Sequence, residues 1–329
     1  MNDTPRTLDE ATVAKLAAVA GALQQQVSQA LLGQDEVLQQ MLCALMAGGH
    51  VLIEGVPGLG KTLMVRALAG AIGCNFARIQ FTPDLMPSDV TGHAVFDAKT
   101  GSFNLRRGPI FTNLLLADEV NRAPAKTQAA LLEVMQEGQV TIEGTSQPLP
   151  PPFMAIATQN PVEHEGTYPL PEAQLDRFLF KIRMAYPSVA DETRMVAAVT
   201  TGRSANTFNL DGVKRSLTAE QVVAVQAVVA KLPVDDVVME YAVRICHATR
   251  TWPGIMLGAG PRGSIALIRA GRAQAVLGGR DFVTPDDVRA VALPALRHRI
   301  MLAPELQIEG QQADDVLRQL LDKVEAPRK

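Results

Sequence analysis

The chain has 329 residues, of which 47% are hydrophobic and 20% are charged, a composition typical of a globular protein. This length is enough for about two domains of ~150 residues each. The formal net charge of −3 at pH 7 does not indicate the overall basic character that is typical of nucleic-acid-binding proteins, although it does not exclude a local basic stripe.

The N-terminal residues predict a helix and no export signal. Thr7–Glu10 fit a capping box that opens an Ala-rich helix toward Leu32, which we expect in the outer layer of a first domain. No basic region leads into an apolar core, and no apolar run approaches the ~20 residues that a membrane span requires. The three cysteines have no metal-binding spacing, which is typical of buried thiols in a reducing compartment. We therefore expect a cytoplasmic protein with no membrane span.

The next feature is a complete phosphate-loop pattern, GVPGLGKT at Gly55–Thr62. The apolar run His50–Glu54 before it predicts a buried strand, and Leu63–Ala69 after it predicts a helix, which is the context that the pattern requires. Its glycines allow backbone amides to surround an anion, Lys61 supplies a mobile cation, and Thr62 supplies a hydroxyl for Mg²⁺. The pattern predicts binding of a nucleoside triphosphate by Gly55, Pro57, Gly58, Leu59, Gly60, Lys61, Thr62 and Leu63.

Strand and helix patterns then alternate, which predicts an α/β fold with a parallel, doubly wound sheet and a ligand at the carboxyl ends of its strands. Pro124–Glu137 predicts a helix that ends at Gly138. The predicted strands are Val51–Glu54, Phe76–Phe81, Asn113–Ala117, Phe153–Thr158 and Phe178–Ile182.

Two hairpins interrupt this alternation. The first pairs His93–Asp97 with Ser102–Arg106, and the second begins at Gln139–Glu143 and turns at Gly144–Ser146. From Pro187 onward strand patterns vanish, so we expect a nucleotide-binding domain at residues 1–187 and an all-helical domain at residues 188–329. The helical stretches predicted there are Ala190–Thr201, Thr218–Leu232, Asp235–Thr249, Arg262–Leu277 and Thr284–Leu293.

The run Leu114–Ala117 ends in two carboxylates, Asp118 and Glu119. After a phosphate loop, this pattern predicts that Asp118 holds Mg²⁺, because that metal binds a few carboxylates together with phosphates and water. Glu119 is predicted to orient and polarise the attacking water.

Five segments together resemble the MoxR family of AAA+ ATPases, in the family's order and over Leu31 to Ile300. The resemblance implies an αβα nucleotide-binding domain with a helix-2 insert and a pre-sensor-1 hairpin, a helical lid, and a homo-oligomeric ring, usually hexameric. It also implies ATP and Mg²⁺ as cofactors, and chaperone-like remodelling of client proteins, often with a partner that bears a von Willebrand factor A domain. The segments are GVPGLGKT, PDLMPSDVTG (Pro83–Gly92), GPIFTNLLLADEVNRAPAKTQAALLEVMQEGQVTI (Gly108–Ile142), ATQNPVEHEGTYPLPEAQLDRFLF (Ala157–Phe180) and TPDDVRAVALPALRHRI (Thr284–Ile300).

The resemblance also implies roles for residues outside the phosphate loop. Asn160 resembles sensor 1, Arg177 resembles the arginine finger presented to a neighbouring subunit, and Arg262 resembles sensor 2. Gln80 stands where related ATPases have a polar switch residue for the catalytic glutamate. The chain departs from the family pattern at His164, where Gln is usual, and at Gly260, where Ser is usual.

We weigh four functions. The first is an ATP-hydrolysing remodelling machine. A nucleic-acid motor would require basic hairpin tips; Lys99, Arg106 and Arg107 occur in the first hairpin, whereas Gln139–Gln147 has no Lys or Arg. A metal-chelatase ATPase subunit has a similar architecture, and only the identity of its partner would distinguish it from the remodelling machine. A small-molecule phosphotransferase is disfavoured by the Asp-Glu pair and the finger-like arginine. We expect no nucleic-acid partner.

Overall fold

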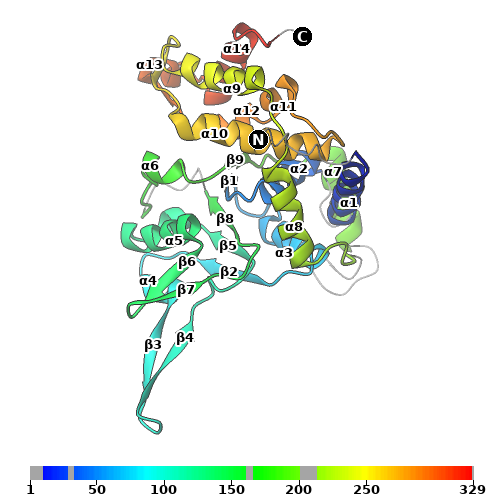
Figure 1. Cartoon of the computed structure of the whole chain (residues 1–329). Coiled ribbons are helices and arrows are strands. Elements are labelled where there is room, and N and C mark those ends of the chain that lie inside the picture. The colour runs from blue at the N-terminus through cyan, green and yellow to red at the C-terminus, as the bar shows by residue number, and fades with distance from the viewer. Residues whose placement is uncertain (1–9, 29–32, 161–165, 201–212, 328–329) are drawn as a thin grey trace, which may run out of the picture.

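The computed structural model describes residues 10–28, 33–160, 166–200 and 213–327. Its centre is a sheet of five parallel strands in the order β2-β5-β8-β1-β9, which confirms the predicted α/β architecture (Figure 1). Each strand lies close to its predicted range: β1 Val51–Glu54, β2 Phe76–Gln80, β5 Leu114–Asp118, β8 Met154–Gln159 and β9 Phe180–Arg183.

The two faces of the sheet are covered by different helices. Val51 and Ile53 of β1 are buried in one hydrophobic cluster with α2 (Asp35–Met46) and α3 (Lys61–Ala71), whereas Leu52 is buried in a second cluster with α5 (Ala125–Glu137). This division follows from the alternation of side chains along a strand. The α5 helix ends where predicted, at Gly138, which has a φ of 63°. The N-terminal helix α1 (Glu10–Ser28) packs on α2 and α3; its predicted capping residue Thr7 lies outside the described residues.

Both predicted hairpins are present. After the short helix α4 (Pro87–Thr91), β3 (Gly92–Asp97) and β4 (Ser102–Arg107) form a ribbon that projects away from the rest of the molecule (Figure 1). The second hairpin is β6 (Gln139–Ile142) with β7 (Thr145–Pro148). The predicted turn at Gly144–Ser146 was wrong, because the turn residues are Glu143 and Gly144, with φ of 48° and 75°, and Thr145 and Ser146 belong to β7. Two positive φ values are the requirement of a two-residue type I′ turn.

The C-terminal part is mostly helical and sits above the sheet domain in Figure 1. The predicted stretch Thr284–Leu293 divides into two helices, and a short antiparallel pair, β10 with β11, has no counterpart in the sequence predictions. The elements are the connecting helix α6 Glu172–Leu175, then α7 Val189–Thr200, α8 Ala219–Ala230, α9 Asp236–Thr249, β10 Ile255–Leu257, α10 Pro261–Leu277, α11 Pro285–Ala290, α12 Ala292–Leu296, β11 Met301–Leu302, α13 Pro304–Ile308 and α14 Ala313–Lys323.

This helical part, called the lid below (residues 213–327), shares a core with the sheet domain. Leu267 and Ala270 of α10 belong to the same buried cluster as Leu42 of α2 and Ile53 of β1. Arg269 of α10 also donates hydrogen bonds to the carbonyl oxygens of Ala47 and Gly48, at 2.9 and 3.1 Å. None of the helices that the structure describes is long and apolar enough to cross a membrane.

Candidate nucleotide site

The phosphate loop lies between β1 and α3, at the carboxyl end of the sheet. Gly58 and Gly60 have φ of 87° and 83°, a region that favours glycine, and Gly60 is the residue that precedes α3. A Cβ on Gly55 would lie 2.8 Å from the carbonyl oxygen of Met184, so the chain permits only glycine there. The loop therefore has the backbone conformation that directs amides, and the start of α3, toward an anion.

Lys61 points back across this loop. Its Nζ donates a hydrogen bond to the carbonyl oxygen of Gly55 at 2.5 Å. Burial lowers the pKa of Lys61, while the nearby carboxylates of Asp118 and Glu119 oppose that change. Since the lysine is half-buried beside two carboxylates, it can exchange its carbonyl contact for the oxygens of a phosphate.

Asp118 and Glu119 follow the central strand β5, as predicted, and Thr158 of the neighbouring strand β8 holds them both. The Thr158 hydroxyl donates to Asp118 Oδ1 at 2.5 Å and accepts from the backbone N–H of Glu119 at 2.9 Å. Glu119 has a φ of 56°, uncommon for a residue with a Cβ, which turns its side chain out of the strand direction. The backbone at Glu119 is thus fixed by the adjacent strand.

The Glu119 carboxylate is hydrogen-bonded by Gln80 and Arg122. Gln80, at the end of β2, donates to Glu119 Oε2 at 2.8 Å, so the structure brings the predicted switch residue to the glutamate. Arg122 reaches the same oxygen at 3.0 Å. Arg78 is ion-paired with Asp118 at 2.6 Å and donates to Gln80 at 2.8 Å. Sequence reasoning missed Arg78, yet it precedes Gln80 by two residues on β2, so strand alternation places both on one face.

Asn160 comes directly after β8, which lies between β5 and β1 in the sheet. Its side chain is buried, and its place is between the strand that carries Asp118 and the strand that leads into the phosphate loop. Four predicted site segments therefore converge at the carboxyl end of the sheet: the loop at Gly55–Leu63, Gln80, the Asp118–Glu119 pair and Asn160.

Thr62 and Asp118 provide the kind of oxygen donors that Mg²⁺ prefers. Among the described residues, no group of three or more His, Cys, Asp or Glu could hold a metal ion. Mg²⁺ is commonly held by one or two protein oxygens together with phosphates and water, and Thr62 and Asp118 at the rim of a phosphate loop are that donor set. These residues fit a magnesium–nucleotide complex.

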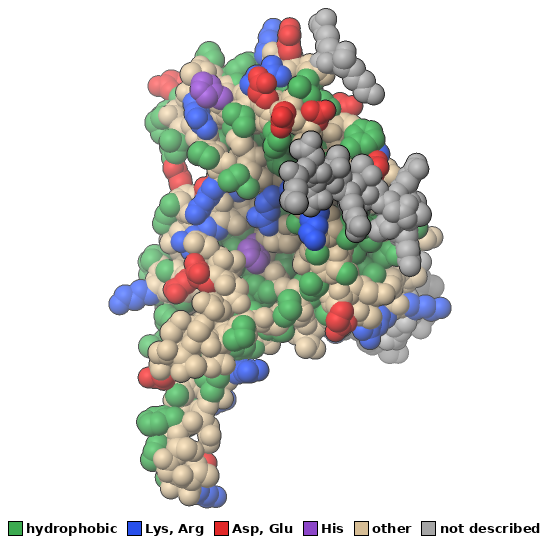
Figure 2. Space-filling model, viewed as in Figure 1, with side chains coloured by type: hydrophobic (Ala, Val, Ile, Leu, Met, Phe, Trp, Pro, Cys, Tyr) green, Lys and Arg blue, Asp and Glu red, His purple; other side chains and the backbone are tan. Residues whose placement is uncertain are grey.

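Arg177 and Arg262 lie at the other end of the strands. They share a cavity of about 430 Å³ with Gly48, Gly49 and His50, which precede β1. Figure 2 shows Lys and Arg side chains gathered at the level where the lid meets the sheet domain. The strand β1 is four residues long, about 13 Å of extended chain, so it separates this cavity from the phosphate loop. The structure does not bring these two arginines to the loop of their own chain.

The contacts of these two arginines differ. Arg177 is partly buried, and its Nε has no hydrogen-bond partner among the described residues. Arg262, in the first turn of α10, is half exposed and lies 3.8 Å from Asp176. Asp176 also pairs with the buried Arg299 at 2.7 Å. Gly260 is the N-cap of α10 and provides no side-chain cap, as its departure from the family pattern implied; His164, the other departure, lies outside the described residues.

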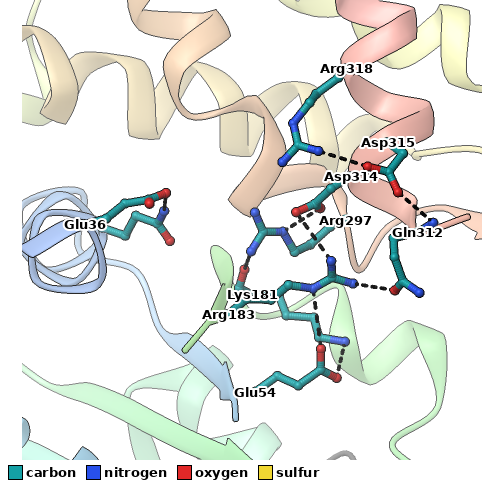
Figure 3. Close-up of polar contacts among 10 residues, drawn as sticks. Glu36, Glu54, Lys181, Arg183, Arg297, Gln312, Asp314, Asp315 and Arg318 are labelled. Atoms are coloured by element: carbon teal, nitrogen blue, oxygen red, sulfur yellow. Dashed lines mark hydrogen bonds and ion pairs between the residues drawn. The ribbon is translucent and has the colours of Figure 1, made fainter. Parts of the chain in front are cut away.

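A charge network joins the sheet domain to the lid next to the phosphate loop (Figure 3). Glu54, the residue before Gly55, is ion-paired with Lys181 of β9 at 2.7 Å. Arg183 of β9 lies 3.7 Å from Glu54 and 3.5 Å from Asp314 of α14, and Asp314 pairs with Arg297 at 3.0 Å. Sequence reasoning missed this network, because its members are separated by up to 260 residues and no local pattern relates them.

Comparisons with known proteins agree with this geometry. A family model described as "ATPase family associated with various cellular activities (AAA)" matches residues 50–180, and one described as "AAA lid domain" matches residues 247–320. The chain is 48% identical over 307 residues to "Uncharacterized protein YeaC" of Bacillus subtilis, covering 93% of this chain and 94% of that protein. It is 42% identical over 316 residues to "Chaperone MoxR1" of Mycobacterium tuberculosis, covering 92% and 81%.

A solved structure, that of a putative ATPase from Cytophaga hutchinsonii, superposes with a TM-score of 0.88 at 39% identity and covers 97% of this chain and 98% of that one. The phosphate loop, the carboxylate pair, the parallel sheet and the lid thus occur together in a chain that is similar to these proteins over nearly its whole length. The chain belongs to the MoxR family of AAA+ ATPases.

Proposed function

We propose that this protein hydrolyses ATP with Mg²⁺ in a ring of identical subunits and uses that hydrolysis to remodel client proteins. One observation carries the ring: Arg177 and Arg262 lie together at the amino end of the sheet, away from the phosphate loop of their own chain. A site that needs both the loop and these arginines is complete only when a second copy supplies them. The resemblance favours a hexamer.

Within one subunit, the groups at the carboxyl end of the sheet have separable tasks. The loop amides and Lys61 bind the phosphates, and Thr62 and Asp118 hold the metal. Mg²⁺, when bound, neutralises charge on the phosphate oxygens. Glu119 orients and polarises the attacking water, and Asn160 holds that water or the terminal phosphate.

Arg177 and Arg262 then act on the nucleotide of the neighbour. A guanidinium inserted beside the transferring phosphoryl group stabilises the charge of the transition state, an effect of about 10³–10⁵ in rate in related enzymes. The Arg177 Nε supports this role: it has no hydrogen-bond partner within the part of the chain that the structure describes, and a buried donor left in that state is costly unless a ligand uses it. The pairing of Arg262 with Asp176, next to Arg177 in the chain, supports a shared task for both arginines.

The hydrolytic assignment is tested with Glu119→Gln. This variant should bind ATP normally and lose turnover by about 10²–10⁴-fold, since only the positioned base is removed. Glu133→Gln, an exposed position on α5, is the matched control and should behave as wild type. Wild-type turnover in Glu119→Gln would contradict the assignment.

The assignment in trans is tested by mixing. Arg177→Ala should bind ATP and hydrolyse it poorly. In a mixed ring with Glu119→Gln, an interface can combine the intact site of the first variant with the intact finger of the second, so the mixture should exceed both variants measured alone. If co-assembled mixtures show no gain, Arg177 does not act in trans.

We further propose that residues 1–187 form the nucleotide-binding domain and that residues 188–329 form an all-helical domain, of which the lid is the larger part. We also propose that the protein is cytoplasmic, and that a protein with a von Willebrand factor A domain is its partner. The chaperone name of the relative from Mycobacterium tuberculosis favours remodelling over a metal-chelatase subunit. A pull-down from native lysate with Glu119→Gln, which should hold ATP and client together, tests the partner.

The β3–β4 hairpin argues against a nucleic-acid motor. Arg107 pairs with Gly92 at the base of the ribbon, and Arg106 precedes it, so neither lies at the tip. Near the tip, Phe96 and Phe103 are 56% and 72% exposed, with ring centroids 5.3 Å apart. Figure 2 shows hydrophobic side chains along this projection. Lys99 is the single Lys or Arg of the turn between β3 and β4, and its backbone N–H donates to the Asp97 carboxylate, so positive and negative charge lie side by side at the tip. One lysine beside a carboxylate gives little counterion release on a phosphate backbone, whereas the exposed apolar pair suits a protein client.

A further inference from the structure

The lid holds the segment that carries Arg177. Arg299, which follows α12, is a buried arginine whose side chain is 3% exposed. Its Nη2 donates to the carbonyl oxygens of Asp176 and Phe178, at 3.1 and 2.7 Å, and its Nη1 donates to that of Leu179 at 3.2 Å. These carbonyls stand on both sides of Arg177 in the chain.

Two further hydrogen bonds join the lid to the segment that carries Arg177. Arg299 Nε donates to Asp176 Oδ1 at 2.7 Å, and the ring nitrogen Nε2 of His298 is hydrogen-bonded to the carbonyl oxygen of Phe178 at 3.0 Å. The Arg299 Nη1 group also donates to the carbonyl oxygen of Ala295, which anchors the guanidinium to the lid. All three side-chain nitrogens of Arg299 are therefore hydrogen-bonded, and most of their partners are the main-chain oxygens that flank Arg177 in the chain.

This geometry is more specific than an ordinary contact between domains. A guanidinium is planar and rigid, and it presents several donors in fixed directions, so it can define the path of a short segment. The segment lies between α6, which ends at Leu175, and β9, which begins at Phe180. Its amides donate to α6 and to His50, for example Arg177 N–H to the carbonyl oxygen of Gln174 at 3.2 Å, whereas its carbonyl oxygens accept from Arg299. Arg299 is thus the lid's share of the support of this segment, and the path of the main chain at Arg177 depends in part on it.

We propose that Arg299 is a positioning residue for the arginine finger: it sets the main chain around Arg177, and through Asp176 it also orients Arg262, so that the lid determines how a subunit presents both arginines to its neighbour. This inference rests on the proposed action of Arg177 in trans. It assigns no contact between Arg299 and the nucleotide.

The main variant is Arg299→Lys, which keeps the buried charge but has one donor group in place of the fork. Its own nucleotide site is intact, so ATP affinity should be unchanged, while turnover should fall by about 10- to 100-fold, the loss expected when a catalytic group moves by about 1 Å. Arg272→Lys is the matched control, a partly buried lid arginine that donates to the carbonyl oxygen of Ala230, within the lid. It should retain wild-type turnover.

Mixing separates positioning from a general loss of structure. Arg299→Lys should regain activity in mixed rings with Glu119→Gln, because it supplies intact sites, and should regain none with Arg177→Ala, because both lack a working finger. If Glu119→Gln complements Arg177→Ala but does not complement Arg299→Lys, the Arg299 proposal fails, while the proposed action of Arg177 in trans is supported. If neither is complemented, the action in trans fails and the Arg299 proposal falls with it.

A second comparison applies if Arg299→Lys does not assemble. Asp176→Asn removes the charge that pairs with both Arg299 and Arg262. If this substitution is made in an Arg262→Ala background, the pair with Arg262 is already absent, so any further change in turnover comes from the pair with Arg299. Turnover should fall further in the double variant than in Arg262→Ala alone, with ATP affinity unchanged. Equal turnover in the two would overturn the proposal.

Discussion

At the scale of single residues, the two carboxylates at the carboxyl end of the sheet are held by polar neighbours on adjacent strands. Thr158 binds both Asp118 and the backbone of Glu119, and Gln80 binds the Glu119 carboxylate. Because these partners come from the strands that flank β5, the carboxylates are oriented before a ligand arrives. Such preorganisation lowers the cost of reaching the transition state.

Lys61→Ala tests the phosphate loop. We expect ATP affinity to fall by about 10- to 100-fold, because a charge-assisted hydrogen bond contributes about 1.5–3 kcal/mol. Titration with a fluorescent ATP analogue measures the change, and Lys126→Ala, on the exposed side of α5, is the control. An unchanged affinity in Lys61→Ala would exclude Lys61 as a phosphate ligand.

His50 makes stability depend on pH. Its Nδ1 accepts from the backbone N–H of Ala155, its Nε2 binds the carbonyl oxygen of Met135, and burial lowers its pKa to about 4. The unfolded chain, with a histidine pKa near 6.5, therefore binds more protons between about pH 6.5 and 4. The stabilisation is fully present above pH 6.5 and is lost as the pH falls toward 4.

The expected loss from His50 is at most about 3 kcal/mol, from a pKa difference of about two units. His298, whose pKa burial also lowers, adds a loss of the same sign. Urea unfolding measured between pH 7.5 and 4.5 should show a shallower decline in His50→Gln than in wild type, and the exposed His93→Gln should match wild type. Parallel profiles for His50→Gln and wild type would show that His50 is not the titrating group.

At the scale of elements, the edge strand β9 is the link between nucleotide site and lid. Its residues contact Glu54 before the phosphate loop and Asp314 in α14, and Arg297 donates to the carbonyl oxygen of Lys181 at 3.1 Å. The same lid segment, Arg297–Arg299, also reaches the main chain around Arg177. The strand β9 thus contacts the residue before the phosphate loop, and the lid segment contacts both β9 and the main chain around Arg177.

Asp314→Asn tests the lid part of this network. Arg297 and Asp314 are 7% and 9% exposed, so removal of one charge leaves the other buried without its partner, and we expect a loss of about 3 kcal/mol in the free energy of unfolding. Glu240→Gln removes an exposed pair with Arg244 in α9 and should cost less than about 1 kcal/mol. Urea denaturation of both variants decides the matter: equal small losses would mean that the network is solvated and does not support the lid.

At the scale of the whole molecule, lid and sheet domain form one packed unit, and the residues proposed to act in catalysis lie at opposite ends of its strands. The phosphate loop lies at the carboxyl end of the strands, and Arg177 with Arg262 lies at the amino end. A chain built in this way can supply half of one site and half of another, which suits a closed ring with identical head-to-tail interfaces.

The charge distribution of the molecule predicts its response to nucleic acid. With a net charge of −3 and exposed phenylalanines near the hairpin tip, binding to DNA would release few counterions, so neither single- nor double-stranded DNA should stimulate ATP turnover at physiological salt. The measurement is ATPase activity with and without each DNA at two salt concentrations. Robust, salt-sensitive stimulation would favour the motor over the remodelling machine.

Local patterns alone determined much of this molecule. The five strands, the position of the phosphate loop, the carboxylate pair after β5 and the long lid helices all follow from periodicity and motif spacing, because each depends on neighbours within one element. The turn of the second hairpin was misplaced by the same reasoning, since strand pairing, rather than turn propensity, decided that Thr145 and Ser146 extend β7. The β10–β11 pair was missed because strands of three and two residues carry no period.

Only the tertiary structure decided which side chains meet. Arg78 and Asp118 are 40 residues apart, and Arg299 and Asp176 are 123 apart, yet each pair is in direct contact. The sequence suggested Arg177 and Arg262 separately, through family resemblance, whereas the packing of the lid against β9 places both in one cavity at the amino end of the sheet. Contacts of this kind depend on how elements pack across the whole chain, and no local pattern encodes them.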